Sequence, residues 1–253
     1  MKHLFTPEGL QALHQTLQHH PLLAFDFDGT LVPIIQDPHD ARLSTAATRQ
    51  LQGLTQRYPV ALISGRSVDD LKLRVPGIHP LMIIGNHGLE DADDPTPRPQ
   101  EWVDALNPLR DALHQHASTL KDQAILIEDK RYSIALHYRA APDRPTAQYL
   151  LRQMLDALPQ QSQLNIFGGK ELFNVVAAHT PDKADALFRL VERCQAQSAI
   201  FLGDDLNDEP VFNRAPAHFL TVKITPTAQV SKAKFFLKSP EEVSQLMQMM
   251  LDF

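Results

Sequence analysis

The stretch Leu22-Leu23-Ala24-Phe25-Asp26-Phe27-Asp28-Gly29-Thr30-Leu31 joins an apolar run to two carboxylates and a glycine. Such a run is typical of a buried strand in a parallel sheet. The acids follow it, so they lie at the carboxyl end of the strand, the edge where open α/β sheets bind ligands. Asp26 and Asp28 would repel each other there unless a cation, a shared proton or hydrogen-bond donors offset the repulsion. Mg2+ suits this position because it prefers oxygen ligands and takes one or two carboxylates. An ordinary Asp-Gly turn would explain Asp28 and Gly29 but not Asp26.

The composition of the 253 residues excludes several classes of protein. A net charge of −6 argues against a nucleic-acid-binding protein, which needs a basic face. The single cysteine, Cys194, cannot form an intrachain disulfide and fits a reducing compartment. No stretch resembles a signal peptide or reaches the roughly 20 apolar residues of a membrane span. We expect a cytoplasmic monomer with no nucleic-acid or membrane partner.

Strand and helix signals alternate in the first and last thirds of the chain. Strands are expected at residues 22–27, 59–63, 81–84, 199–202, 218–222 and 235–237. Helices are expected at 10–17, 44–58, 182–195 and 241–251, with Ser44 as the N-cap of the second. This alternation predicts an α/β fold with a doubly wound, Rossmann-like parallel sheet.

The middle third predicts a different, smaller domain. A linker rich in Asp and Pro at 91–100 is followed by a helix at 102–120, interrupted at Pro108. Strands at 124–128 and 132–138, a helix at 146–158 and strands at 163–167 and 171–176 come next, with a hairpin turn at Gly168-Gly169. The order α-β-β-α-β-β predicts an antiparallel α+β domain inserted into the parallel one. We expect core residues 1–100, an inserted domain at 101–178 and core residues 179–253.

Two segments could bind phosphate at the sheet edge. Ser64-Gly65 follows the second strand, where a hydroxyl and backbone N–H groups can bind a phosphate oxygen, although a turn capping the next helix is the alternative. Lys183 opens a helix at Asp182, and a cation opposes the macrodipole there unless an anion lies nearby. A phosphate would be such an anion.

A second acidic cluster follows a later strand, in Gly203-Asp204-Asp205-Leu206-Asn207-Asp208. Asp204 or Asp205 could complete an oxygen site for Mg2+ beside Asp26. We expect Asp208 to support the metal ligands or to organise the phosphate-binding loop.

The two acids of the first motif can divide the work of phosphoryl transfer. A carboxylate at Asp26 can attack phosphorus, which splits the hydrolysis into two easier steps. Asp28 can protonate the leaving oxygen and then activate water. Thr30 can hold Asp28 or a phosphate oxygen, or it can be a plain turn residue.

In this order, the four segments resemble the haloacid dehalogenase superfamily of phosphotransferases. The resemblance implies a nucleophile at Asp26, an acid/base at Asp28, and phosphate binding by Ser64, Gly65 and Lys183. It also implies Mg2+ held by Asp26, Asp28 and Asp204. Thr30, Asp205 and Asp208 would then support these ligands. An acid at the Asp28 position accompanies phosphatases and phosphomutases in that superfamily.

The chain also carries a closer resemblance, to trehalose-6-phosphate phosphatases. It rests on Gly85-Asn86-His87-Gly88-Leu89-Glu90, on Glu128-Asp129-Lys130 and on Leu136-His137-Tyr138-Arg139, and nearly the whole chain is covered. Polar side chains on a sheet that closes over the core would form a lid for a sugar phosphate; a sheet with one solvated face is the alternative. The substrate-side residues implied are Arg66, His87, Glu128, Lys130, His137, Arg139, Lys170 and Asn174.

Departures from the pattern of those phosphatases leave the identity of the substrate undecided. Those phosphatases usually carry Glu where this chain has Asn174, followed by a basic residue and Pro, and Gly where it has Ala184. We expect an Mg2+-dependent phosphatase acting on trehalose 6-phosphate. The alternatives are a phosphatase for another glycosyl phosphate, such as a glucosylglycerol phosphate, and a non-catalytic phosphosugar-binding module.

Overall fold

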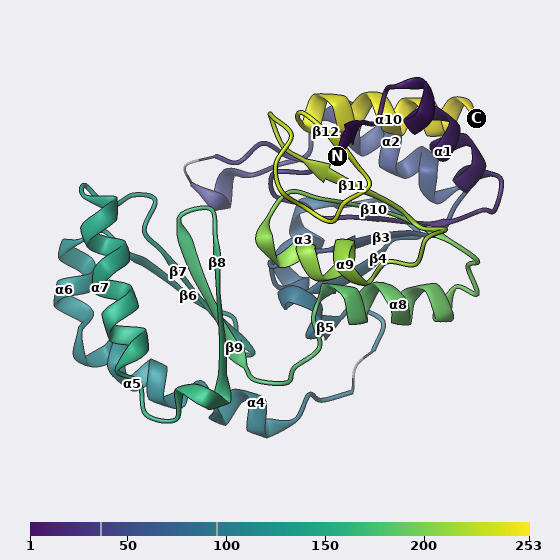
Figure 1. Cartoon of the computed structure of the whole chain (residues 1–253). Helices are drawn as coiled ribbons and strands as arrows, with labels where there is room; N and C mark the ends of the chain where they lie inside the picture. Colours follow the sequence, from purple (N-terminus) through teal and green to yellow (C-terminus); the bar gives the residue numbers. More distant parts are fainter. Residues whose placement is uncertain (36, 95) are drawn as a thin grey trace. The chain divides into compact units, whose positions relative to one another are not determined.

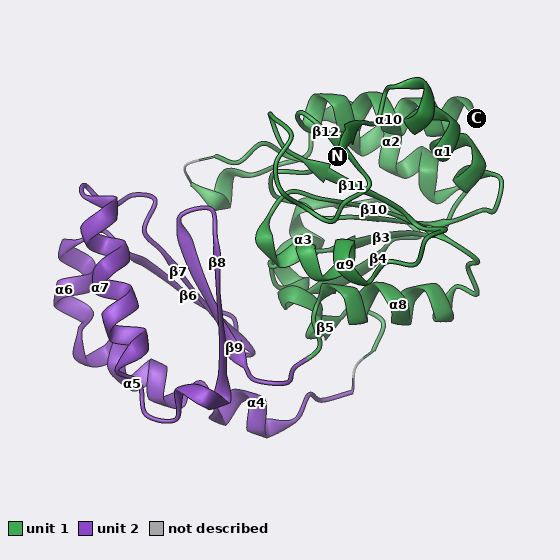
Figure 2. Ribbon diagram, viewed as in Figure 1, with its two compact units in different colours: residues 1–95, 181–253 green, residues 96–180 purple. Residues whose placement is uncertain are grey.

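The structure is a computed structural model that describes residues 1–35, 37–94 and 96–253. The chain forms two compact units, residues 1–95 with 181–253 and residues 96–180 (Figure 2). The divisions expected after residues 100 and 178 lie within five residues of these bounds. None of the helices in the described parts of the chain is long and apolar enough to cross a bilayer.

The first unit is built on an eight-stranded sheet with the order β1-β12-β11-β10-β2-β3-β4-β5. The strands are β1 (Lys2–His3), β2 (Leu22–Phe25), β3 (Val60–Ile63), β4 (Met82–Gly85), β5 (Glu90–Asp91), β10 (Ala199–Gly203), β11 (Leu220–Ile224) and β12 (Phe235–Leu237). Every neighbouring pair is parallel except β4–β5. Because β2 pairs with both β10 and β3, strands from the two ends of the chain meet at the centre of the sheet.

Helices cover both faces of this sheet (Figure 1). Buried residues of α1 (Pro7–Leu17), α2 (Thr45–Thr55), α3 (Val68–Arg74) and α10 (Pro240–Asp252) share one core cluster, and those of α8 (Lys183–Arg193) and α9 (Glu209–Arg214) share another. In β2, Leu23 and Phe25 join the first cluster, whereas Leu22 and Ala24 join the second. Burial on both faces explains the unbroken apolar run. The doubly wound parallel fold is therefore confirmed.

The second unit is a four-stranded antiparallel sheet with helices on one face. Its strands β6 (Leu126–Asp129), β7 (Ser133–His137), β8 (Leu164–Gly169) and β9 (Leu172–Ala177) have the order β6-β7-β9-β8. Its helices are α4 (Gln100–Asp104), α5 (Asn107–Gln115), α6 (Ala117–Asp122) and α7 (Arg144–Asp156). Ile134, Leu136 and Val175 of the sheet pack with α5 to α7 in a core of this unit's own.

The described residues also form four short 3₁₀ turns, namely η1 (Pro38–Asp40), η2 (Asn86–Gly88), η3 (Gln161–Gln163) and η4 (Leu206–Asp208). Ser44 is the N-cap of α2, as expected, because its side chain accepts a hydrogen bond from the N–H of Ala47. The helix expected at 102–120 is divided among α4, α5 and α6. The interruption expected at Pro108 agrees with the start of α5 at Asn107, whereas the division between α5 and α6 was not expected.

The hairpin turn predicted at Gly168-Gly169 was wrong. Both glycines stay in the ladder, where Gly168 pairs with Phe173 and Gly169 with Leu172. The turn falls on Lys170 and Glu171, and Glu171 adopts the left-handed conformation with φ of 63°. Arg139 and Arg144 both form ion pairs with the Glu171 carboxylate, and these contacts support a turn at this non-glycine residue.

Candidate active site

Four adjacent parallel strands of the first unit end in polar side chains. Asp26 follows β2, Ser64 follows β3, His87 lies in η2 after β4, and Asp204 follows β10. The register pairs Phe25 with both Leu62 and Leu202, so these carboxyl ends are level. The structure thus brings three of the four motifs, and the predicted His87, to one edge of the sheet.

Lys183 and three carboxylates form the centre of this edge. The Nζ atom of Lys183 lies 3.1 Å from Asp26 Oδ1 and 2.7 Å from Asp208 Oδ1. Asp26, Asp204 and Asp208 are buried, and each offers a carboxylate oxygen within 4.8 Å of the others. Only 1% of Lys183 is exposed, so its ammonium is buried among these carboxylates.

The loop after β10 is shaped by Asp208 and Gly203. Asp208 Oδ2 accepts hydrogen bonds from the backbone N–H groups of Asp204 at 2.9 Å and Asp205 at 3.0 Å, while Oδ1 accepts from Lys183. A Cβ atom at Gly203 would lie 2.3 Å from the Asp208 carboxyl carbon. The small residue at 203 therefore lets Asp208 fold back and tie the loop to Lys183.

Gly29 permits a similar close approach on the neighbouring loop. It has a φ of +80°, and a Cβ atom there would lie 2.0 Å from Asp204 Oδ2. Both the backbone conformation and the contact require glycine. The turn after Asp28 is thereby able to lie against the acidic group that follows β10.

The negative charge of Asp26, Asp204 and Asp208 exceeds the positive charge of Lys183, which favours the binding of a further cation. Burial raises the pKa of Asp26 well above its usual value; Lys183 opposes that rise, and the charges of Asp208 and Asp204 add to it. Burial would lower the pKa of Lys183, but the carboxylates of Asp208 and Asp26 outweigh it and hold that pKa above its ordinary value. Three carboxylates face one ammonium, so a divalent cation would neutralise the remaining charge. An all-oxygen donor set fits a hard divalent cation.

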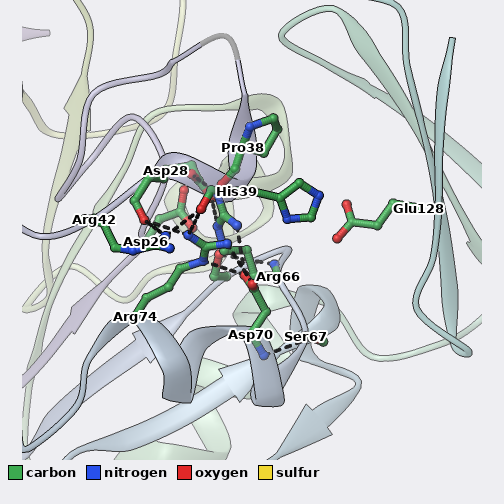
Figure 3. Close-up of polar contacts among 12 residues, drawn as sticks. Asp26, Asp28, Pro38, His39, Arg42, Arg66, Ser67, Asp70, Arg74 and Glu128 are labelled. Atoms are coloured by element: carbon green, nitrogen blue, oxygen red, sulfur yellow. Dashed lines mark hydrogen bonds and ion pairs between the residues drawn. The ribbon is translucent and has the colours of Figure 1, made fainter.

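Asp28 is engaged by Arg66 rather than by this group. Arg66 Nε donates to Asp28 Oδ2 at 2.6 Å, and Nη2 donates to Oδ1 at 2.7 Å (Figure 3). Burial would lower the pKa of Arg66, but its hydrogen bonds and ion pairs with Asp28 and Asp70 outweigh this and raise it. The assignments of Asp28 as a metal ligand and of Arg66 as a substrate group stay predictions, and the observed partner of each is the other.

Ser64, Gly65 and His87 form the next part of the edge. Ser64 is buried, and its Oγ accepts a hydrogen bond from the N–H of Arg66 at 3.3 Å. A Cβ atom at Gly65 would lie 2.5 Å from His87 Cε1, so the imidazole rests directly on this glycine. Thr30 lies in the loop after β2 and is fully buried, and Asp205 lies in the loop after β10.

In the second unit, the predicted substrate residues gather on the sheet face opposite its core. Glu128, Ala135, Asn174 and Phe167 pair in one cross-strand row. Glu128 Oε2 lies 3.2 Å from both Lys130 Nζ and His137 Nε2. Burial would raise the pKa of Glu128, but the hydrogen bond from His137 and the charge of Lys130 outweigh it and lower that pKa to about 2.

Three other residues of this unit were also predicted to contact the substrate. Asn174 is buried, with 3% of its surface exposed. Lys170 lies in the turn between β8 and β9. Arg139 follows β7, where its Nε donates to Glu171 Oε2 at 3.3 Å. The substrate roles of all three stay predictions.

Asp70 and Arg74 were not among the predicted site residues. Asp70 accepts hydrogen bonds from Arg66 Nη1 at 2.8 Å and from Arg74 Nε and Nη2, each at 2.7 Å. Arg66, Asp70 and Arg74 follow one another at intervals of four residues, which is the spacing of ion pairs on a helix. This spacing could have predicted their contacts from the sequence.

Comparison with known proteins shows which family the chain belongs to. A family model described as Trehalose-phosphatase matches residues 24–241. The trehalose-phosphate phosphatase of Mycobacterium marinum (strain ATCC BAA-535 / M) is 32% identical over 257 residues, covering 94% of this chain and 64% of that protein. The one from Mycobacterium leprae (strain TN) is 33% identical over 265 residues, covering 94% and 60%. The chain thus spans less than two thirds of the length of these curated relatives.

Solved structures share the fold. The C-terminal domain of Candida albicans trehalose-6-phosphate phosphatase matches with a TM-score of 0.82 at 21% identity, covering 96% of each chain. An N-terminally truncated, IMP-bound IMP-nucleotidase of Plasmodium falciparum matches with a TM-score of 0.59 at 14% identity, covering 96% of this chain and 71% of that one. The family match extends from β2 into the first turn of α10 and includes the residues at the sheet edge. On that match, the chain belongs to the trehalose-phosphatase family, of the haloacid dehalogenase type.

Proposed function

We propose that this protein is a phosphatase that hydrolyses trehalose 6-phosphate to trehalose and phosphate through an aspartyl phosphate. The observation that carries the proposal is the contact of Lys183 with Asp26 at the carboxyl end of β2, beside Asp204 and Asp208. A buried carboxylate next to a fixed ammonium can accept a phosphoryl group whose oxygens that ammonium neutralises.

The cation proposed for this site is Mg2+. Asp26 and Asp204 would hold it through carboxylate oxygens, and Asp208, the third member of the cluster, lies close enough to contribute or to orient its waters. When bound, such an ion neutralises charge on the transferring phosphoryl group.

The protein's own groups divide the remaining work. Asp26 attacks phosphorus while Lys183 and the Ser64 hydroxyl bind the phosphoryl oxygens. Asp28 gives a proton to the departing sugar oxygen, and then takes one from the water that hydrolyses the aspartyl phosphate. Arg66 holds both oxygens of Asp28 and so fixes the direction in which it can act.

The substrate assignment draws on the family and on the second unit. The curated relatives, of which this chain spans 64% and 60%, carry the name trehalose-phosphate phosphatase. The face bearing Glu128, Lys130 and His137 offers charged groups of both signs, which suits the many hydroxyl groups of a disaccharide.

A second candidate is a phosphatase for another glycosyl phosphate. Asn174 favours it, because a neutral amide stands in the same cross-strand row as Glu128, where a second carboxylate would have bound sugar hydroxyls more strongly.

A panel of sugar phosphates distinguishes the two candidates. We expect the highest kcat/KM for trehalose 6-phosphate when phosphate release is measured with Mg2+ for trehalose 6-phosphate, glucose 6-phosphate and a glucosylglycerol phosphate. Highest efficiency with another ester would favour the second candidate. No release from any ester, including an aryl phosphate, would leave only a binding module.

A further inference from the structure

We propose that Asp70 is a positioning residue for Asp28, acting through Arg66, so that it governs proton transfer to the leaving group. This inference rests on the proposed function, because it assigns to Asp28 the acid step of phosphate-ester hydrolysis. Asp70 lies on α3 and touches none of Asp26, Lys183 or Asp204 by any hydrogen bond or ion pair identified among the described residues.

Arg66 has few donors left for a substrate. Its Nε and one Nη2 hydrogen bond hold Asp28, its second Nη2 bond goes to the carbonyl of Pro38 at 2.8 Å, and Nη1 donates to Asp70. The guanidinium also lies over the ring of Phe27, with Cζ 5.6 Å from the centroid. Four of the five N–H donors of a guanidinium are thus engaged within the protein.

Asp70 fixes Arg66 from the side opposite Asp28, as Figure 3 shows. Its own position is set by Arg74, which donates to both Asp70 oxygens at 2.7 Å. The Arg74 side chain is 4% exposed, and its Nη1 also donates to the carbonyl of Ala41 at 2.6 Å. The result is a chain of alternating charges, Asp28–Arg66–Asp70–Arg74, whose far end is anchored in the protein.

Loss of the Asp70 charge would affect Arg66 and, through it, Asp28. Two guanidinium groups would then share one neutral side chain, and Arg66 would lose the partner that sets its angle to Asp28. A small rotation of Asp28 misdirects its proton, and misplacement of a reacting group by about 1 Å can cost about a hundredfold in rate.

Comparing esters with different leaving groups distinguishes a positioning role of Asp70 from a purely structural one. A purely structural defect should lower kcat/KM equally for all esters. A sugar hydroxyl leaves only when protonated, whereas an aryl oxide such as p-nitrophenolate leaves without a proton. Since kcat/KM reports the steps up to phosphoryl transfer to Asp26, a defect in proton donation should appear with the sugar phosphate and vanish with the aryl phosphate.

The test compares Asp70→Asn with Asp69→Asn. Asp69 is the neighbouring residue of α3, is exposed and undergoes the same loss of charge. For Asp70→Asn we expect kcat/KM to fall roughly ten- to a hundredfold with the best sugar phosphate and less than about threefold with p-nitrophenyl phosphate. Asp69→Asn should leave both values near wild type, and Asp70→Glu should restore part of the loss.

Three results would overturn the inference: equal losses with both esters in Asp70→Asn, no loss with either, or the same pattern in Asp69→Asn. If Asp70→Asn does not fold, Arg74→Gln tests the same chain from its far end, with the same expected ester dependence and the same contradicting results. A wild-type protein that releases phosphate from no ester would instead refute the proposed function, so the two failures are distinguishable.

Discussion

At the scale of single residues, Asp26 combines deep burial with three neighbouring carboxylates. Burial raises its pKa, and Lys183 only partly offsets the effect. A raised pKa means that the cation-free protein keeps a proton on Asp26 at pH values where an exposed aspartate is ionised. A divalent cation must therefore displace that proton when it binds.

The stabilisation of the protein by Mg2+ should consequently depend on pH. The proton on Asp26 competes with the cation at low pH and is lost as the pH rises through the raised pKa, so affinity increases with pH. We expect Mg2+ to raise the melting temperature more at pH 8 than at pH 5. Differential scanning fluorimetry with and without Mg2+ checks this, with Asp204→Asn as a variant that should lose most of the shift. An equal shift at both pH values would contradict the assignment of the cation to this cluster.

Sequence alone could predict which residue types meet at this edge. Asp26, Ser64 and Asp204 each follow an apolar strand, and parallel strands align their carboxyl ends. It could not predict that Arg66 turns toward Asp28. That direction depends on Phe27 beneath the guanidinium and on the carbonyl of Pro38, neither of which is coded by local spacing.

At the scale of elements, the start of α8 places Lys183. Asp182 is the N-cap, and its side chain accepts hydrogen bonds from the N–H groups of Ala184 at 2.8 Å and Asp185 at 3.0 Å. Asp185 accepts one in return from the N–H of Asp182 at 2.9 Å, which completes a capping box. The cap sets where the helix begins, and Lys183 is its first residue.

Removal of this cap should affect both stability and activity. Asp182→Ala is expected to lower the free energy of unfolding by about 1 kcal/mol, because two backbone donors lose their acceptor. It should also lower kcat, since the first turn carries Lys183. Ser44→Ala is the matched control: it removes the cap of α2, where Ser44 accepts from Ala47 at 3.0 Å.

Urea unfolding measures the stability of the Asp182→Ala and Ser44→Ala variants, and phosphate release measures their kcat. The control should lose similar stability while kcat stays near wild type. An Asp182→Ala variant with wild-type kcat would show that Lys183 is held by its ion pairs with Asp26 and Asp208 alone.

The elements of the second unit show where prediction from sequence failed. The two glycines at 168 and 169 predicted a turn because glycine tolerates turn conformations. The ladder nevertheless continues through them, and Glu171 takes the left-handed position while two arginines bind its carboxylate. The contacts of Arg139 and Arg144 with Glu171 join residues far apart in the sequence, and a local pattern does not contain them.

At the scale of the whole molecule, the chain forms two compact units with separate cores. Residues 96–180 interrupt the parallel fold between β5 and α8, yet β2, β3 and β10 still pair across that interruption. The change from parallel to antiparallel patterning made the insertion visible in the sequence. The residues proposed for phosphoryl transfer all belong to the first unit, so the proposed reaction chemistry can be tested apart from sugar preference.

The most direct test of the proposed chemistry is a pre-steady-state burst with Asp28→Asn and p-nitrophenyl phosphate in the presence of Mg2+. This variant can still form the aspartyl phosphate, because p-nitrophenolate needs no proton, but it lacks the base that activates water. We predict a rapid burst of about one p-nitrophenolate per protein, with a phosphoryl group on the acid-quenched peptide that contains Asp26. The double variant with Asp26→Asn should give neither. A burst that survives Asp26→Asn, or a phosphoryl group found on another peptide, would contradict the account.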